Sequence, residues 1–107
     1  MTDVAAGRIQ VGELAPGRLA LRGTLDFGTA RLAREAGIAW FMRDGARDWV
    51  VDCSGLESAN SAAVAVLLDW LATVHRAGGH LRFEGLPERV RAIAEISEVG
   101  ELLETGV

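Results

Sequence analysis

The sequence predicts an α/β domain in which a four-stranded, mostly parallel sheet starts with an N-terminal hairpin and carries helices packed on it. Two observations support this fold class. Two alternating segments separated by a turn come first, and segments with strand-like and helix-like periodicity then alternate to the end of the chain. Such alternation is typical of parallel strands joined by right-handed helical crossovers. The length of 107 residues suits a single domain, residues 1–107.

The predicted hairpin joins residues 8–12 to residues 18–22. Both segments alternate polar and apolar residues, as half-buried strands do. Ala15-Pro16-Gly17 lies between them. It favours a tight turn because proline fixes φ at one corner and glycine tolerates a positive φ at the next.

The first predicted helix covers residues 27–43, with Asp26 as its N-cap. Apolar residues recur there at three- and four-residue spacing, which indicates one buried stripe. Gly37 costs about 1 kcal/mol relative to alanine inside a helix, so we expect it to permit a close approach to the sheet. The expected stripe consists of Phe27, Ala30, Ala33, Gly37, Trp40 and Phe41.

The rest of the chain predicts two more strands and two more helices. Residues 49–53 are apolar in the manner of a strand covered on both faces, and residues 80–84 alternate. Residues 59–77 predict a long helix stopped by Gly78-Gly79, and Pro87 is expected in the first turn of a third helix. The expected buried residues are Val64, Leu67, Leu68, Leu71 and Val74 in the long helix, Val90, Ile93 and Ile96 in the third, and Val99, Leu102 and Leu103 in a tail on the sheet edge.

Composition argues against several classes of function. The net charge is −4 and the 11 basic residues, all arginines, are scattered, so we expect no nucleic-acid partner. Cys53 is the only cysteine, and it is expected to be a core residue. The longest uncharged run is too short to span a bilayer. We therefore expect a cytoplasmic protein that does not insert directly into a membrane.

Catalytic patterns are missing from the sequence. A phosphate-binding loop needs several glycines and a lysine, and this chain has no lysine. A nucleophile elbow is missing at both Ser54 and Ser61. His75 and His80 flank the Gly78-Gly79 turn without a carboxylate or thiol at matching spacing, so no metal site is expected. The prediction is a protein that is not an enzyme and has no cofactor.

The long helix carries a second stripe that is small and mostly uncharged, formed by Ala62, Ala65, Val66, Asp69 and Thr73. A solvated helix face normally carries more charge. Trp70 borders the stripe, and tryptophan often dominates binding energy. Two interpretations stay open: a partner protein covers this stripe, or a second layer of the same chain does.

Ser61 stands at the start of the same helix, and it also has two interpretations. Ser58, Asn60 or Ser61 is expected to cap the first turn, which is worth about 1 kcal/mol. Alternatively, the Ser61 hydroxyl contacts a partner or is phosphorylated, because a helix N-terminus accommodates added negative charge.

Residues 23–27, Gly-Thr-Leu-Asp-Phe, are similar to the G-x-L-D segment of STAS domains. Residues 52–56 and 60–63 resemble the strand and loop that lead to the signature helix of that family. Three further stretches, residues 66–71, 81–88 and 90–103, resemble the STAS subunit of the Mla phospholipid transporter, MlaB. In that branch the turn is Asp-Thr-Ala-Gly. Asn60 therefore replaces the family aspartate, Ser61 takes the threonine position and Ala63 replaces the glycine.

This resemblance implies a non-catalytic STAS domain that binds the cytoplasmic ATPase of an ABC transporter at the inner membrane. It implies a role in the assembly and activity of that transporter in phospholipid transport. The expected contact residues are Ser61, Ala62, Ala65, Asp69 and Thr73, with Trp70 and Arg89 at the rim. The alternative implied by the wider family is an anti-sigma factor antagonist, phosphorylated on Ser61 by an anti-sigma factor serine kinase.

Overall fold

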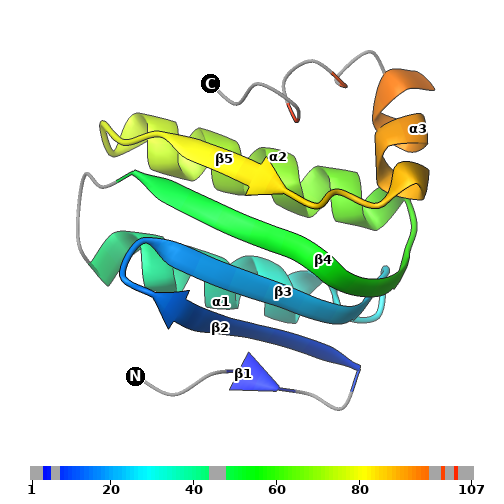
Figure 1. The fold of residues 1–107 in the computed structure, drawn as a ribbon, viewed down its shortest axis with the longest axis horizontal. Coiled ribbons are helices and arrows are strands. Elements are labelled where there is room, and N and C mark those ends of the chain that lie inside the picture. The colour runs from blue at the N-terminus through cyan, green and yellow to red at the C-terminus, as the bar shows by residue number, and fades with distance from the viewer. Residues whose placement is uncertain (1–3, 6–7, 44–47, 97–99, 101–102, 104–107) are drawn as a thin grey trace.

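Within the residues that the computed structural model describes (4–5, 8–43, 48–96, 100 and 103), five strands form one sheet in the order β1-β2-β3-β4-β5 (Figure 1). β1 and β2 pair antiparallel, as do β2 and β3, whereas β3, β4 and β5 pair parallel. The strands are β1 (Val4–Ala5), β2 (Ile9–Ala15), β3 (Arg18–Leu25), β4 (Trp49–Ala59) and β5 (Leu81–Glu84). The predicted fold class is confirmed, and β1 is an additional edge strand.

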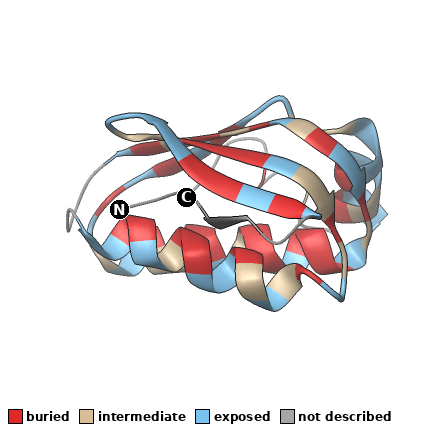
Figure 2. Ribbon diagram, turned by 90° about the horizontal axis from the view of Figure 1, so that it is seen from below, coloured by how far each residue is buried: buried red, intermediate tan, exposed pale blue. Residues whose placement is uncertain are grey.

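Three helices complete the described fold: α1 (Ala30–Arg43), α2 (Ser61–Arg76) and α3 (Glu88–Ile96). α1 and α2 lie side by side on one face of the sheet (Figure 1). Their buried residues face the strands and their exposed residues lie on the outer side of the layer (Figure 2). On the opposite face, polar side chains of β2 and β5 are exposed, and none of the three described helices covers it (Figure 1).

The hairpin forms as predicted, with longer strands. Gly17 has a φ of 81° in the turn, a conformation that glycine adopts readily. The next strand of the sheet, β4, differs from the prediction, because it continues to Ala59 instead of ending at Cys53. Ser54 and Gly55 resemble a loop locally, but the parallel pairing with β3 continues past them with two shifts of register, between Asp52 and Gly55 and between Leu56 and Ser58. Each shift accommodates one extra residue of β4 as a bulge.

α1 begins at Ala30, three residues later than predicted, because Asp26 forms a turn of its own. The Asp26 carboxylate accepts hydrogen bonds from the Gly28 and Thr29 N–H groups at 2.9 and 3.2 Å. The Ala30 N–H donates to the Asp26 carbonyl oxygen at 2.9 Å. The predicted burial of Phe27 is therefore wrong: its side chain lies in the turn and is 76% exposed.

Gly37 permits a close contact between α1 and α2. The predicted close approach of Gly37 to the sheet is therefore wrong. A Cβ atom at Gly37 would lie 2.3 Å from Cε2 of the Trp70 ring. The Trp70 indole N–H donates to the Arg34 carbonyl oxygen at 3.1 Å, and the ring packs edge-on against Phe41. Trp70 is thus completely buried between α1 and α2.

α2 begins at Ser61, two residues later than predicted, and Asn60 is its N-cap. The Asn60 side-chain oxygen accepts a hydrogen bond from the Ala62 N–H at 2.9 Å. Of the three residues considered for this role, Asn60 is the one that performs it. The predicted core stripe is confirmed, with Leu68 only partly buried and the other four residues buried. Gly78, with a φ of 87°, follows the end of the helix.

The third helix buries Val90 and Ala94 and not the whole predicted stripe. Ile96 is 85% exposed, so its predicted burial is wrong: the helix ends there, and the side chain has no neighbour to pack against within the described residues. In the predicted tail, Val99 and Leu102 lie outside the described residues, whereas Leu103 is buried in the core. Cys53 is a core residue, as expected, and burial raises the pKa of its thiol to about 12.

Replacing Gly37 by alanine is expected to destabilise the protein by up to about 2 kcal/mol. Overpacking against the Trp70 ring costs about 1–3 kcal/mol, and the better helix propensity of alanine offsets about 1 kcal/mol. Urea unfolding measures the change. Ala39→Gly, at an exposed position of the same helix, is the control for propensity and is expected to cost about 1 kcal/mol. A stabilised Gly37→Ala variant would contradict the close contact.

Removing the cap by Asn60→Ala is expected to cost about 1 kcal/mol, because one N–H group at the start of α2 loses its partner. Asn60→Asp restores the acceptor and adds a charge that the helix dipole favours, so it is expected to be at least as stable as the wild type. The matched control is Ser58→Ala, an exposed position expected to change the unfolding free energy by less than about 0.5 kcal/mol. Equal effects at the two positions would rule out the cap.

Candidate functional site at the helix N-termini

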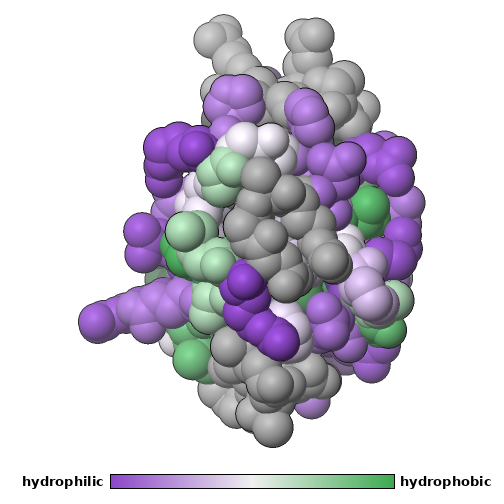
Figure 3. All heavy atoms as spheres, turned by 90° about the vertical axis from the view of Figure 1, so that its left-hand side faces the viewer, coloured by the Kyte–Doolittle hydropathy of each residue, from purple (hydrophilic) through white to green (hydrophobic). Residues whose placement is uncertain are grey.

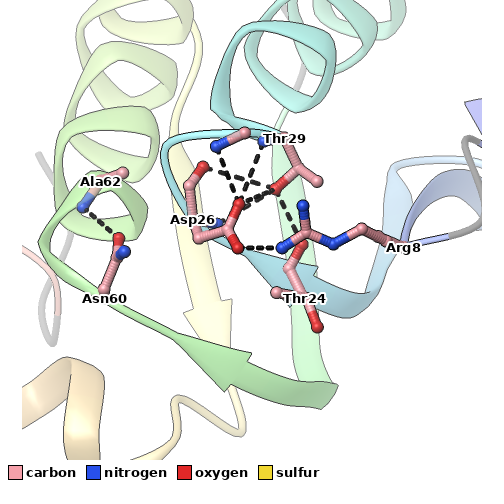
Figure 4. A network of polar contacts seen from close by, with 7 residues as sticks. Arg8, Thr24, Asp26, Thr29, Asn60 and Ala62 are labelled. Carbon is pink, nitrogen blue, oxygen red and sulfur yellow. Dashed lines mark hydrogen bonds and ion pairs between the residues drawn. The ribbon is translucent and has the colours of Figure 1, made fainter.

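The candidate site lies at the edge of the sheet where β3 and β4 end together. The two strands pair in parallel up to Leu25 and Ala59. One residue further, the Asn60 N–H donates to the Leu25 carbonyl oxygen at 3.2 Å. Each strand then leads into a helix, so the first turns of α1 and α2 are neighbours (Figure 4). In open α/β sheets this edge is the usual place for binding.

The entry to α1 is held by a polar network around Asp26 (Figure 4). Arg8 forms an ion pair with the Asp26 carboxylate, and the Thr29 hydroxyl donates to the Thr24 carbonyl oxygen at 2.8 Å. Burial alone would raise the pKa of Asp26. Hydrogen bonds from Gly28, Arg8 and Thr29 and the charge of Arg8 outweigh that effect, so the pKa lies below its ordinary value. The turn therefore keeps a charged carboxylate at neutral pH.

The entry to α2 leaves Ser61 available to a partner. Because Asn60 caps the helix, the Ser61 hydroxyl is not needed there, and it has no hydrogen-bond partner among the described residues. Ser61 is exposed. Its position at the start of the helix places it in the partial positive field of the α2 dipole.

The small stripe of α2 is divided between the two interpretations left open by the sequence. Ala62 and Val66 are buried against α1, so the same chain covers this part of the stripe. The predicted position of Trp70 at the rim is wrong, because α1 encloses its side chain. Ala65 and Asp69 are exposed.

Between the two helices a shallow apolar groove of about 260 Å³ remains open. Four of its lining residues belong to the predicted stripe of α2, and the other four were not predicted as contact residues. Arg34 and Asp69 form an ion pair across it at 2.8 Å. The lining residues are Phe27, Ala30, Arg31, Arg34, Ala62, Ala65, Val66 and Asp69.

Two predicted contact residues, Thr73 and Arg89, do not line the groove. Thr73 is partly buried, and its hydroxyl donates to the Asp69 carbonyl oxygen at 2.8 Å. Arg89 is exposed in the first turn of α3, and α3 starts at the same end of the molecule as α2 (Figure 1). The residues missing from the prediction are mainly Phe27, Arg31 and Arg34, which belong to α1 or to its entry turn. Only the packing of α1 on α2 reveals them.

The other end of the molecule has a different character. Hydrophilic side chains surround small, separate apolar areas on its described surface (Figure 3). His75 and His80 are exposed, and the described residues include no group of three or more histidine, cysteine, aspartate or glutamate side chains that could hold a metal ion. None of the helices among the described residues has the length and apolar character needed to cross a membrane.

Solved structures with the same fold include two kinds of protein. A candidate anti-sigma factor antagonist from Thermotoga maritima has a TM-score of 0.70 and 17% identity, over 86% of this chain and 80% of the other. The anti-sigma factor antagonist SpoIIAA in its unphosphorylated form has a TM-score of 0.68 and 16% identity, over 87% and 83%. These identities support the fold alone. One chain of the Acinetobacter MlaFEDB complex, in an ATP-bound conformation, has a TM-score of 0.67 and 29% identity, over 79% and 88%.

No curated protein sequence is a significant match. The family model described as "Mlab, STAS domain" matches residues 11–104, which include every described element except β1 and the first two residues of β2. The matched range contains both helix entries, the groove and the predicted contact residues. The chain belongs to the MlaB-type STAS domain family.

Proposed function

We propose that this chain is a non-catalytic STAS subunit that binds the cytoplasmic ATPase of an Mla-type ABC transporter. In this role it supports the assembly and activity of the transporter in phospholipid transport, which maintains the lipid asymmetry of the outer membrane. The main support is the family match over residues 11–104, together with the likeness to a chain of the Acinetobacter MlaFEDB complex.

The proposed contact surface combines the apolar groove with the start of α2. The groove offers apolar area beside an exposed aromatic ring, Phe27, and apolar area with polar surroundings is typical of interface cores. Ser61 adds a free hydroxyl at one end. Ala65 and Asp69 lie within the groove, and Thr73 continues the same face of α2. A partner helix can approach because the exposed side chain of Ala65 is small.

Trp70 has an indirect role in this proposal. It is buried between α1 and α2, where its ring lies against Gly37, and it does not line the groove. Arg89 remains a proposed rim residue, exposed at the end of the molecule where α2 begins. The subunit would be cytoplasmic and peripheral to the inner membrane through its partner. It would need no cofactor or nucleic acid and would not insert directly into the membrane.

A second candidate function is that of an anti-sigma factor antagonist controlled by phosphorylation of Ser61. Its support is the exposed hydroxyl at a helix N-terminus, where added negative charge is favoured, and the fold shared with SpoIIAA. The neutral Asn60 in place of the family aspartate argues against recognition by a kinase that needs an acidic residue. The transporter subunit is therefore the leading proposal.

Ala65→Glu is expected to weaken binding to the purified ATPase subunit of the same organism at least about tenfold, because it forces a carboxylate into an apolar contact. Ser61→Glu is expected to weaken binding as well. Isothermal titration calorimetry provides the measurement. Ala39→Glu, the same change at an exposed alanine of α1 outside the groove, is the matched control and should bind like the wild type. No binding by the wild type, or equal affinity of all four proteins, would refute the proposal.

The intact mass of the protein from its native host tests the second candidate separately. An addition of one phosphate group, located on Ser61 and lost in Ser61→Ala, supports the kinase-regulated antagonist. An unmodified mass, under conditions in which the wild type binds the ATPase subunit, supports the transporter role.

A further inference from the structure

The open face of the sheet contains a second concave site, which the proposed function does not use. It is a hollow of about 640 Å³ over β2, β3 and β4, within the size range of small-molecule sites. The strand register places Gln10, Arg22 and Gly55 in one row across the three strands. Their neighbours Leu21 and Leu56 are buried, so this row points away from the helices. The lining residues are Arg8, Ile9, Gln10, Arg22, Gly23, Thr24, Gly55 and Glu57.

Two glycines form the floor of the hollow. A Cβ atom at Gly55 would lie 2.6 Å from Cγ of Arg22, so the arginine stem rests on the bare backbone of β4. Gly23 has a φ of 99°, and a Cβ atom there would lie 2.2 Å from the Arg8 carbonyl oxygen. The Thr24 N–H donates to that same oxygen at 2.6 Å. The backbone thus holds β2 and β3 close together beneath the site.

Two arginines, Arg8 and Arg22, line the hollow. Arg22 is exposed and forms no ion pair or side-chain hydrogen bond within the part of the chain that the structure describes, although its charge helps to lower the pKa of Asp52. Arg8 is held in position by its ion pair with Asp26, which the turn before α1 fixes in place. A guanidinium group has five N–H donors, so Arg8 keeps donors for a second acceptor.

Hydrogen-bond acceptors also line the hollow. Glu57 is exposed and has no ion-pair partner among the described residues, and Gln10 offers both an amide oxygen and an amide NH₂ group. A bare inorganic anion would be attracted by the two arginines and repelled by Glu57. A ligand that carries hydroxyl groups beside its anion would satisfy both the arginines and the acceptors.

We propose that this hollow binds a phosphate ester that carries free hydroxyl groups, of the glycerol phosphate type. Arg22 and Arg8 bind the phosphate oxygens, since guanidinium groups suit bidentate recognition of phosphate. Glu57 and Gln10 accept hydrogen bonds from the hydroxyl groups. The same chemistry occurs in a free glycerol phosphate and in the headgroup of phosphatidylglycerol. The hollow shares no lining residue with the apolar groove of the proposed ATPase contact.

Isothermal titration calorimetry with sn-glycerol 3-phosphate tests the site on the whole chain. Saturable binding is expected, and Arg22→Ala should weaken it about tenfold or more, because a charge-assisted contact to phosphate is lost. Arg82→Ala is the matched control: Arg82 is an exposed arginine on the same face of the sheet, outside the hollow, and its loss should leave the affinity unchanged. Circular dichroism verifies that both variants are folded.

Glu57→Gln tests whether Glu57 accepts hydrogen bonds from the hydroxyl groups of the ligand. With inorganic phosphate as the probe, this variant should bind more tightly than the wild type, whereas its preference for glycerol 3-phosphate over inorganic phosphate should fall. Vesicles of phosphatidylglycerol, compared with vesicles of phosphatidylcholine, distinguish the sources: binding to the former without binding of free glycerol 3-phosphate assigns the lipid headgroup. Binding to neither probe, or equal losses in Arg22→Ala and Arg82→Ala, would overturn the proposal.

Discussion

The contact between Gly37 and the Trp70 ring determines how the helix layer packs. Because Gly37 has no side chain, α1 approaches α2 closely enough to bury Trp70 completely. Phe41 packs edge-on against both Trp70 and Trp49, with ring centroids 5.7 and 5.3 Å apart, and so joins the helix pair to β4. Ala62, about two helix turns before Trp70, is also buried. The groove between the N-terminal parts of the two helices continues the same helix–helix interface.

Sequence periodicity was sufficient to predict the fold class. It was not sufficient to predict where the helices and strands begin and end, or which element each helix face packs against. The spacing in α1 correctly indicated a buried stripe, yet it could not show that the Asp26 turn delays the helix to Ala30 and leaves Phe27 exposed. Ser54 and Gly55 have loop propensities, which pairing with β3 overrides. α2 has two apolar stripes, and only tertiary packing decides which of them Trp70 joins.

Arg8 connects the two faces of the molecule. Its guanidinium pairs with Asp26 in the turn that precedes α1, and it also lines the hollow on the open face of the sheet. The α2 entry lies beside that turn because the Asn60 N–H donates to the Leu25 carbonyl oxygen. An apolar groove and a polar hollow therefore depend on one short segment at the end of β3. The G-x-L-D pattern singled out this segment in the sequence. The sequence could not show that the same segment also contacts Arg8 beside the hollow on the other face of the sheet.

Asn60 gives the start of α2 the features on which the proposed standing contact depends. An aspartate at this position would also cap the helix, but it would place a full negative charge beside Ser61. That charge would repel a phosphate group attached to Ser61. Asparagine supplies the same acceptor to the Ala62 N–H without that charge. The helix N-terminus keeps its partial positive field, and the Ser61 hydroxyl stays free of the cap. The proposed contact therefore rests on three features of this surface: a capped helix start, an unused hydroxyl at Ser61 and the adjacent apolar groove.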